Sequence, residues 1–336
     1  MNNALHKTLT VAIPIYNTAL YLEQCLSSVL NEMTPPDVEV LLINDGSTDR
    51  SAEIIDSYAQ AFPEQTRVIH KENGGWGSCI NLAMKSAAGK YFRILDSDDW
   101  VSRDYFPLYI KELREINTDA AATEMVEIYS GGRQKIFDIP SGIKGSVSSM
   151  SDYIKDGSGF PMGMLTVRTS LLKRGEMEVS ERYYSDIEFI LKAVTSAKDV
   201  YFGCGALYMY RKTDNNASTA QLGYARHRRD FLRMSLHLVQ YRSTVGESLP
   251  PETKQFFDND LLRIGRFSHQ LYLSPIYHLA DVPPNTEELR RWSEELRRLA
   301  PELYRKLGKV RRKGIPCIWI WRAFNINLYN IIKLWK

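Results

Sequence analysis

The chain has 336 residues, of which 44% are hydrophobic and 25% are charged, and its formal net charge is +3. This composition is typical of an ordinary folded protein and excludes an intrinsically disordered one, because so long a chain can bury a sizeable core. The four cysteines are widely spaced and form no C-x-x-C pair, so the sequence predicts neither a zinc site nor a disulfide framework.

Long apolar segments are missing from the sequence. No stretch approaches the roughly 18 apolar residues that a membrane-spanning helix needs. Residues 1–10 lack the apolar run of a secretory signal, so nothing in the sequence predicts export. We therefore expect a cytoplasmic protein, although a peripheral contact with a membrane surface stays open.

The first 116 residues alternate between predicted strands and predicted helices. Apolar runs predict strands, and apolar side chains at helical spacing predict helices. The predicted strands are residues 9–15, 38–43, 67–70 and 91–95, and the predicted helices are residues 19–30, 54–62, 78–88 and 105–116. This α/β alternation predicts a mostly parallel central sheet flanked by helices, in which ligands bind at the carboxyl ends of the strands.

The rest of the chain has fewer signals. Residues 125–129 and 135–139 flank two glycines and predict a hairpin, and residues 141–159 predict either a lid over a ligand or a plain solvated loop. A helix is expected at residues 187–195. Beyond residue 220 the chain is predicted to be helical, and the clearest segments are 224–241 and 287–307.

A cluster of acidic residues follows the fourth predicted strand. Asp96, Ser97, Asp98 and Asp99 stand directly after an apolar run, where side chains converge on a cleft. Hard oxygen ligands suit Mg²⁺ or Mn²⁺, and both ions complete their coordination shells with phosphate oxygens. The cluster therefore indicates either a divalent cation beside a phosphate-bearing ligand or a solvated acidic turn. We expect a structural role for Asp99.

Two further loops follow predicted strands. The Asp45 carboxylate could accept a hydrogen bond from a nucleobase imide, or it could cap the helix that comes next. Residues 73–77 are rich in glycine, which allows close approach of a ligand to the backbone. They match neither the phosphate loop of ATPases nor the G-x-G-x-x-G of dinucleotide folds, so both of those classes are disfavoured.

Four ordered motifs together resemble glycosyltransferase family 2. They are VAIPIYN at residues 11–17, LINDGSTD at 42–49, KENGG at 71–75 and LDSDD at 95–99. A chance match to four ordered motifs is far less expected than a match to one. The resemblance implies a GT-A fold, a nucleotide-sugar donor and transfer with inversion at the anomeric carbon.

By position, the resemblance assigns the donor site to the strand ends. Pro14, Ile15 and Tyr16 are similar to the family's wall for the uracil ring, Asp45 to its partner for the uracil imide, and Asn73 to a nearby donor contact.

The resemblance also assigns the acidic residues. Asp96 is similar to the ribose-side carboxylate and Asp98 to the ligand of the Mg²⁺ or Mn²⁺ ion, and Ser97 is placed with the donor-binding residues. Asp186 stands where the family carries Glu-Asp before a helix, so it is the candidate general base for the acceptor hydroxyl.

The chain departs from the family pattern at three places. Ile80 stands where many relatives carry an arginine, so one possible phosphate partner is missing. Ser185 replaces the usual glutamate, and with Glu188 it also fits a capping box for the helix that follows. No histidine follows the later Tyr-Arg pair as a further metal ligand, so either Asp214 or water is expected to substitute. Arg211 or Lys212 could contact the diphosphate.

The resemblance leads to a domain organisation and a function. We expect a GT-A domain at residues 1–220, with a donor half at 1–110 and an acceptor half at 111–220, followed by a helical extension at 221–336. The expected activity is metal-dependent transfer of one sugar from a UDP-sugar to an acceptor hydroxyl, in assembly of cell-surface polysaccharide or glycoconjugate. The alternative is a catalytically silent scaffold that binds nucleotide sugars beside a membrane-bound partner.

The C-terminal segment carries the positive charge. Nine Lys and Arg residues and no acidic residue follow Glu302, so the first 302 residues have a net charge of −6. Residues 309–336 mix these basic residues with aromatic ones, which predicts either a packed helix or a peripheral contact with the anionic inner face of the cell membrane. The acceptor would then be a glycan or a lipid-linked glycan. Nucleic acid is not an expected partner, because no recognition motif is present.

Overall fold

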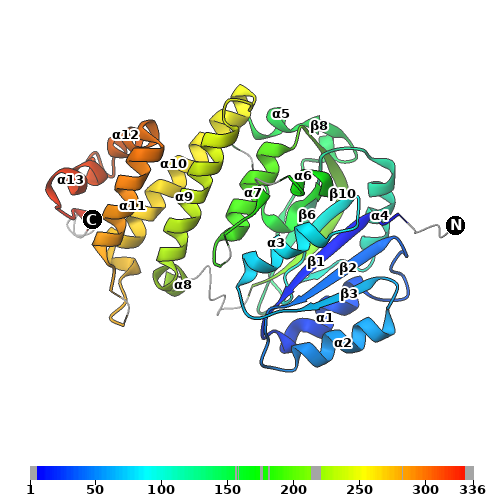
Figure 1. Cartoon of the computed structure of the whole chain (residues 1–336). Coiled ribbons are helices and arrows are strands. Elements are labelled where there is room, and N and C mark those ends of the chain that lie inside the picture. Colours follow the sequence, from blue (N-terminus) through cyan, green and yellow to red (C-terminus); the bar gives the residue numbers. More distant parts are fainter. Residues whose placement is uncertain are drawn as a thin grey trace. The chain divides into compact units, whose positions relative to one another are not determined.

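The computed structural model describes residues 6–155, 157, 159–174, 177–180, 182–212, 221–281 and 283–329. The chain forms two compact units, Met1–Asp214 and Asn215–Lys336, and each is described by itself (Figure 1). The boundary falls within residues 213–220, which lie outside the described residues.

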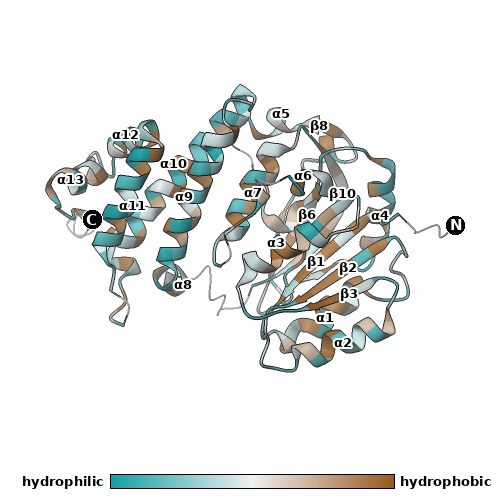
Figure 2. Cartoon of the chain, viewed as in Figure 1, coloured by the Kyte–Doolittle hydropathy of each residue, from teal (hydrophilic) through white to brown (hydrophobic). Residues whose placement is uncertain are grey.

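Parallel strands form the first half of the sheet in unit 1. They are β1 (Leu9–Ile15), β2 (Val38–Asn44), β3 (Thr66–His70) and β4 (Tyr91–Ile94), in the order β3-β2-β1-β4. Every residue of β1 and β2 is buried, and the strands are among the most hydrophobic parts of Figure 2. Pro14 lies beyond Ala12, the last residue of β1 that pairs with β4, so its missing N–H costs no bond to that strand. The four predicted strands are confirmed.

Helices connect these strands as the apolar spacing predicts. They are α1 (Ala19–Val29), α2 (Ser51–Ala61), α3 (Trp76–Ser86) and α4 (Phe106–Glu115). The side chains of α1 that recur at helical spacing, such as Leu22 and Leu26, are fully buried. In the packing, α1 contacts α2, whereas α3 contacts β1 and β2.

The second half of the sheet mixes strand directions. Its strands are β9 (Leu165–Arg168), β6 (Ala120–Tyr129), β10 (Asp199–Lys212) and β5 (Trp100–Val101), and the path from β4 runs β4-β9-β6-β10-β5. Antiparallel β9 joins the two halves, because it pairs with β4 on one side and with β6 on the other. The sequence analysis missed β9 and β10, whose residues show no clean alternation.

The predicted hairpin is confirmed, because β7 (Gln134–Phe137) pairs with β6 in antiparallel register. The prediction of a loop at residues 141–159 is wrong in part. This segment contains the 3-10 helix η1 (Ser141–Ile143), the strand β8 (Val147–Ser149), which pairs with β10, and the helix α5 (Met150–Ile154). The many serines of this segment favoured the prediction of a loop, whereas pairing with β10 stabilises β8.

Two short helical turns flank β9. They are the 3-10 helix η2 (Met162–Met164) and the helix α6 (Thr169–Leu172), and α6 contacts both α3 and α7 (Ser185–Ser196). The α7 helix is confirmed, but the capping box predicted for it is wrong. Tyr184 precedes the helix with a left-handed backbone, φ 67°, and the Ser185 hydroxyl donates to the Arg182 carbonyl. Glu188 accepts instead from the backbone N–H and the hydroxyl of Ser180.

Close packing joins α3 to the chain that leads into α7. A Cβ atom at Gly77 would lie 1.8 Å from the Ser180 carbonyl oxygen, which is far inside van der Waals contact. Only glycine therefore allows this approach. Asn81, one turn further along α3, accepts from the Val179 N–H at 2.9 Å and donates to its carbonyl at 2.8 Å. These contacts set the position at which α7 begins.

Unit 2 is helical throughout its described residues, as predicted. Its elements are α8 (Gln221–Arg226), α9 (Arg228–Val245), α10 (Pro251–Leu273), the 3-10 helix η4 (Pro275–Tyr277), α11 (Thr286–Leu299), α12 (Pro301–Lys309) and α13 (Cys317–Phe324). The predicted segment 287–307 is two helices, because Pro301 has no N–H and cannot continue α11. None of the helices that the structure describes is both long enough and apolar enough to cross a membrane.

An unusual histidine lies in the core of unit 2. The His269 side chain is fully buried, and its ring meets the rings of Trp292 and Trp321 edge-on, with centroids 5.3 and 5.9 Å away. Nδ1 lies 2.8 Å from the Gly265 carbonyl oxygen, while Nε2 has no hydrogen-bond partner among the described residues. Burial and then the charge of Arg322 lower the His269 pKa to about 3. The ring is therefore neutral at neutral pH.

We predict that His269 makes unit 2 sensitive to acid. The unfolded chain binds the proton near pH 6.5 and the folded chain only near pH 3, so this contribution to stability is complete above pH 6.5 and is lost as the pH falls. Between pH 7 and pH 5 the loss should be about 2 kcal/mol. Urea unfolding at both pH values should show this loss in the wild type and not in His269→Met.

The matched control is His237→Met, since His237 is an exposed residue of α9. This control should keep the pH dependence of the wild type. An equal change with pH in the wild type and His269→Met would contradict the prediction.

Candidate active site

Polar side chains gather where the parallel strands end. Tyr16 follows β1, Asp45 follows β2, Lys71 follows β3 and Asp96 follows β4. The four strands are neighbours in one sheet, so their carboxyl ends share an edge. The sequence analysis singled out three of these positions and missed Lys71.

Asp99 is the innermost residue of the acidic cluster. Its side chain is fully buried, where it accepts from the Tyr208 hydroxyl and from the Arg211 N–H, both at 2.7 Å. Burial raises its pKa well above the usual range, and the charges of Asp98 and Asp96 add to the effect. Asp99 therefore ties the loop after β4 to β10, which agrees with the structural role expected for it.

Asp96 receives two donors from elsewhere in the fold. Its carboxylate accepts from the Trp76 indole N–H at 2.8 Å, and its backbone N–H donates to the Tyr208 hydroxyl at 3.2 Å. Burial, and then the charges of Asp98 and Asp186, together raise the pKa of Asp96 to about 7. Asp186 thus lies close enough for its charge to contribute to the Asp96 pKa, although it is 90 residues further along the chain.

Asp98 differs from its neighbours because the described residues show only its own backbone N–H as a donor to its carboxylate. Within the described residues, this carboxylate makes no side-chain hydrogen bond or ion pair, and burial raises its pKa. The charge of Arg211 opposes that shift. Because Arg211 and the Asp98 backbone N–H compensate the ionised carboxylate only in part, a bound cation would stabilise it.

Arg211 lies beside the cluster and is held there on several sides. Its Nε donates to the Asp98 carbonyl at 2.7 Å and its Nη2 to Gln24 Oε1 at 2.6 Å. The guanidinium carbon lies 4.7 Å from the ring centroids of both Tyr21 and Trp100. The guanidinium predicted to contact a diphosphate is thus held next to the candidate metal ligand.

Asp186 is the second residue of α7, and its carboxylate lies near the helix N-terminus. Burial raises its pKa, and hydrogen bonds from backbone N–H groups, Ile187 first, oppose the rise. A carboxylate whose pKa is raised toward neutrality is a better proton acceptor than an ordinary aspartate. The geometry is therefore compatible with the predicted role of a general base.

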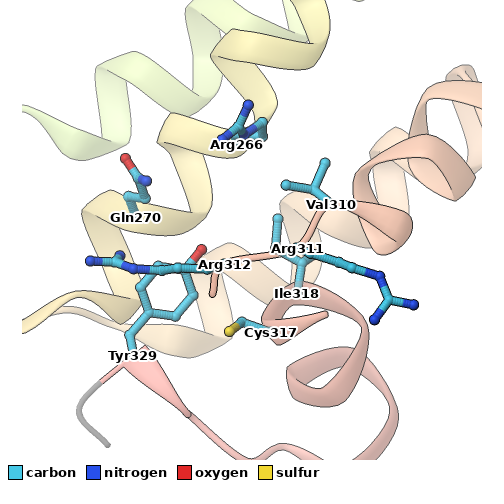
Figure 3. A pocket seen from close by; sticks show the side chains of 8 residues that line it. All are labelled: Arg266, Gln270, Val310, Arg311, Arg312, Cys317, Ile318 and Tyr329. Carbon is cyan, nitrogen blue, oxygen red and sulfur yellow. The ribbon is translucent and has the colours of Figure 1, made fainter. Parts of the chain in front are cut away.

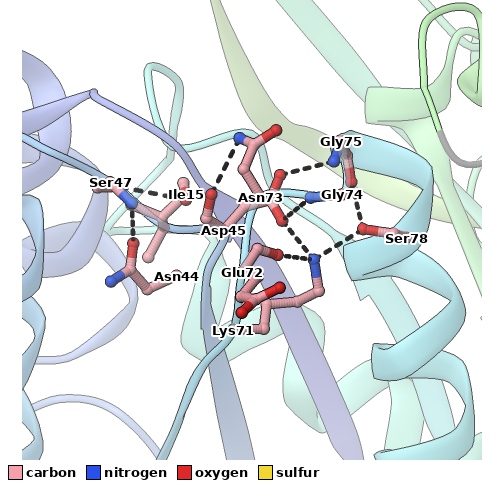
Figure 4. Close-up of polar contacts among 10 residues, drawn as sticks. All are labelled: Ile15, Asn44, Asp45, Ser47, Lys71, Glu72, Asn73, Gly74, Gly75 and Ser78. Carbon is pink, nitrogen blue, oxygen red and sulfur yellow. Dashed lines mark hydrogen bonds and ion pairs between the residues drawn. The ribbon is translucent and has the colours of Figure 1, made fainter.

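Asp45 organises the glycine-rich loop (Figure 4). It is 3% exposed, and its oxygens accept from Lys71 Nζ at 2.5 Å, the Gly74 N–H at 2.9 Å and the Gly75 N–H at 2.8 Å. The Asn73 amide donates to the Asp45 carbonyl at 3.0 Å. Gly75 has φ 91°, a backbone conformation that favours glycine, at the position before α3. Asp45 therefore fixes the glycine-rich loop, in addition to the predicted contact with a nucleotide-sugar donor.

The other predicted donor residues lie at the same edge. Pro14 and Ile15 are buried, whereas Tyr16 is half-exposed beyond the end of β1. Ser97 is buried, and its hydroxyl accepts from Thr18 Oγ1 at 2.9 Å, next to the start of α1. Their contacts with a donor stay predictions.

The residues present offer an incomplete metal site. No group of three His, Cys, Asp or Glu side chains suited to a metal ion occurs in the part of the chain that the structure describes. Asp214, the substitute ligand considered from the sequence, lies outside the described residues. Asp98 offers a carboxylate that, among the described residues, accepts only from its own backbone N–H, which fits an ion such as Mg²⁺ that keeps several waters and binds phosphate oxygens.

The chain matches a known family and known proteins. The family described as "Glycosyl transferase family 2" matches residues 10–215. Similarity also extends to "Uncharacterized glycosyltransferase EpsJ" of Bacillus subtilis (strain 168), with 29% identity over 217 residues, 62% of this chain and 62% of EpsJ. The chain therefore spans less than two thirds of the length of this relative.

Solved structures share the fold. A crystal structure of S. aureus TarS 1-349 in complex with UDP-GlcNAc superposes with a TM-score of 0.66 and 20% identity, over 97% of this chain and 90% of that one. The mannosyltransferase PcManGT from Pyrobaculum calidifontis, in complex with GDP-Man and Mn2+, gives a TM-score of 0.50 at 17% identity, over 99% and 84% of the two chains. The expected GT-A fold is confirmed.

We predict that the ion pair of Asp45 and Lys71 stabilises unit 1. The two side chains are only 4% and 22% exposed, so replacing either leaves the other without its partner in a poorly hydrated place. Asp45→Asn should lower the free energy of unfolding by about 3 kcal/mol. In a double-mutant cycle with Lys71→Met, measured by urea unfolding, the coupling energy should exceed about 1 kcal/mol.

The matched control is the surface pair of Arg50 and Glu53, whose side chains are 80% and 71% exposed. Its coupling energy should stay below about 0.5 kcal/mol. Additive effects of Asp45→Asn and Lys71→Met would show that the pair has no net role.

Proposed function

Because the chain belongs to glycosyl transferase family 2 and is thus a glycosyltransferase, we propose that it moves one sugar from a UDP-sugar to an acceptor hydroxyl, with inversion. The observation that carries the proposal is the acidic cluster at the carboxyl end of β4, where the Trp76 indole N–H donates to Asp96 and where the charges of Asp98 and Asp186 both influence the Asp96 pKa. A candidate base and a candidate cation ligand therefore act within one cluster, at the strand ends where α/β sheets bind ligands. Cell-surface polysaccharide or glycoconjugate assembly is the proposed setting.

For the donor, we propose that the uracil ring lies against Pro14, Ile15 and Tyr16 and that its imide meets Asp45. Asp45 accepts from Lys71, Gly74 and Gly75, and the Cys79 thiol also hydrogen-bonds to its carboxylate. Because a carboxylate offers about four acceptor positions and a thiol is a weak donor, the imide N–H would replace Cys79, and the glycine-rich loop can stay in place when the donor binds. The TarS complex with UDP-GlcNAc supports a uridine nucleotide on this fold.

For the diphosphate, we propose that Asp98 holds a Mg²⁺ or Mn²⁺ ion. A divalent cation at this place would neutralise the negative charge that develops on the departing nucleoside diphosphate. Its binding would also remove the cost of keeping Asp98 ionised beside Asp96 and Asp99. The guanidinium of Arg211, held against the Asp98 carbonyl, adds a fixed positive charge on the same side.

For the acceptor, we propose that Asp186 is the general base. The acceptor oxygen forms a bond to the anomeric carbon while the bond from that carbon to the diphosphate oxygen breaks. The hydroxyl proton passes to the Asp186 carboxylate, whose pKa is raised by burial. Attack from the face opposite the leaving diphosphate inverts the anomeric carbon, which requires the base and the cation to lie on different sides of the sugar.

We predict that single substitutions separate these two roles in an assay of UDP release from UDP-sugars with Mg²⁺ or Mn²⁺. Asp186→Ala should lower the turnover rate by about 10²–10⁴-fold and leave donor affinity unchanged, because the base acts only on the acceptor. Asp98→Ala should lower turnover at least as much and should also abolish the dependence of donor affinity on the cation, as measured by calorimetry.

The control is Asp104→Ala, since Asp104 is an exposed acid outside the cluster. This variant should turn over within about twofold of the wild type, as surface substitutions usually have small effects. Equal turnover in all four proteins would refute the site. Donor binding without turnover in the wild type, with every acceptor tried, would favour the scaffold function.

We further propose that the C-terminal segment contacts an anionic membrane. Cys317, Ile318 and Trp321 of α13 are buried in unit 2, which agrees with the packed helix predicted as one alternative. The opposite face exposes Trp319 by 51% and Phe324 by 61%, with ring centroids 5.7 Å apart. Aromatic rings next to a segment rich in Lys and Arg suit the interface of an anionic bilayer. Residues 330–336 of the predicted segment lie outside the described residues.

We predict that Trp319→Ala combined with Phe324→Ala weakens binding to vesicles of phosphatidylcholine and phosphatidylserine by about tenfold. Each lost ring removes apolar area from the lipid interface. Co-sedimentation measures the effect. Leu222→Ala removes an exposed apolar side chain from α8 and should leave vesicle binding unchanged. If the variant with both Trp319→Ala and Phe324→Ala binds vesicles as well as Leu222→Ala does, membrane contact through α13 is excluded.

A further inference from the structure

A small basic pocket lies within unit 2 (Figure 3). Its volume is about 110 Å³, and it is lined by Arg266, Gln270, Val310, Arg311, Arg312, Cys317, Ile318 and Tyr329. None of these residues is acidic. A cavity needs only about 10–15 Å³ to hold one water molecule, so this pocket can hold a larger group.

The arginines of the pocket lack the acidic partners that their neighbours have. Arg263 of α10 pairs with Asp260, and Arg298 of α11 pairs with Glu295, each with an acid three residues away. By contrast, no carboxylate pairs with Arg266, Arg311 or Arg312 anywhere in the described parts of the chain. Figure 3 shows the Arg311 and Arg312 side chains extending in opposite directions, so the repulsion that an anion in the pocket would remove is that between Arg266 and Arg312, whose charges both act on Tyr329.

The Tyr329 ring lines the pocket and is influenced by the positive charges of both Arg312 and Arg266. Tyr329 is buried, and the guanidinium carbon of Arg312 lies 5.1 Å from its ring centroid. Burial raises the pKa of the Tyr329 phenol to about 12, while the charges of both Arg312 and Arg266 act against this rise. Arg266 comes from α10 and Arg312 from the link between α12 and α13, so separate segments direct positive charge at the same place.

The start of α13 adds to this electrostatic environment. Cys317 and Ile318, its first two residues, line the pocket, and no side chain caps the helix. The N–H groups of a first helical turn carry partial positive charge and attract an anion, although the Cys317 N–H already donates to the Ile315 carbonyl at 2.9 Å. The Gln270 amide supplies a neutral donor on another wall, and Arg311 is oriented by its bond to the Gly314 carbonyl at 2.8 Å.

We propose that this pocket binds a phosphoryl group. The planar fork of a guanidinium matches two phosphate oxygens at once, and Arg266 and Arg312 supply two such forks without competing carboxylates. The site is separate from the nucleotide-sugar site of unit 1 and would hold a second phosphate-bearing molecule. That molecule is either a soluble phosphate compound or a lipid with a phosphate headgroup, and both have the same chemistry at the pocket.

The test uses the full chain in buffer with EDTA, so that no cation can recruit diphosphate to Asp98. Calorimetric titration with pyrophosphate should show saturable binding, and Arg266→Gln with Arg312→Gln should weaken it by at least about tenfold. Both arginines are exposed, so these changes leave no buried void. Arg263→Gln, one turn before Arg266 in α10, removes the same charge outside the pocket and should bind within about twofold of the wild type.

A second arm identifies the source of the phosphate. Vesicles of phosphatidylcholine, with and without phosphatidic acid, are tested on the same variants and on Trp319→Ala with Phe324→Ala. If the wild type binds pyrophosphate and the variant with both Arg266→Gln and Arg312→Gln does not, the ligand is a soluble phosphate compound. Binding only to phosphatidic acid vesicles, again lost in the glutamine variant, supports a lipid. Loss of membrane contact through the aromatic face should leave pyrophosphate binding unchanged, so the two proposals fail independently.

Two results would overturn the pocket proposal. The first is a failure of the glutamine test. Either the wild type shows no saturable binding to pyrophosphate or to phosphatidic acid vesicles, or the variant with both Arg266→Gln and Arg312→Gln binds as well as the wild type. The other comes from Arg266→Lys with Arg312→Lys, which keeps both charges and removes both forks. This variant should bind clearly more weakly than the wild type, whereas equal binding would show diffuse attraction to a basic surface rather than a phosphate site.

Discussion

Mutual repulsion among carboxylates is the constraint on which unit 1 depends. Asp96, Asp98 and Asp99 follow β4 within four residues, and α7 adds Asp186, so negative charges accumulate where the sheet ends. Several donors hold this cluster together. The Tyr208 hydroxyl bridges the Asp96 N–H and the Asp99 carboxylate, and other donors come from α3 and β10. Within the described residues, Asp98 has just its own backbone N–H as a donor to its carboxylate, and for this reason a bound ligand can relieve the cost of keeping it ionised.

A buried arginine below the cluster shows how the sheet supports it. Arg93 of β4 is almost fully buried, and its guanidinium donates to Thr166 Oγ1 at 2.9 Å and to the Gly163 carbonyl. The same group lies 5.8 Å from the ring centroid of Tyr208, the residue that bridges the aspartates. Burial lowers the Arg93 pKa, so the fold bears a cost to keep a cation here. The buried cation thus lies against the aromatic ring whose hydroxyl donates to Asp99.

The sequence allowed much of the donor side to be predicted and less of the acceptor side. Continuous apolar runs identified β1 to β4, and the residues after each run proved to share one edge, because parallel strands leave no alternative. Lys71 was missed although it stands inside a recognised motif, since a pattern of residues does not show which side chain pairs with Asp45. Tyr208 was missed because β10 combines a bulge with mixed polarity, and its contact with Asp99 spans over 100 residues of chain.

The approach of Gly77 to Ser180 has a consequence for redesigning the enzyme. The residue before this glycine, Trp76, donates to Asp96, and the segment after Ser180 carries Asp186, so one backbone contact joins the segments of the proposed cation ligand and the proposed base. Libraries that aim at new acceptors should leave positions 77 and 180 fixed and vary the exposed neighbours Arg182 and Tyr183. Substitutions at those two exposed positions leave the close packing of α3 against the chain before α7 intact.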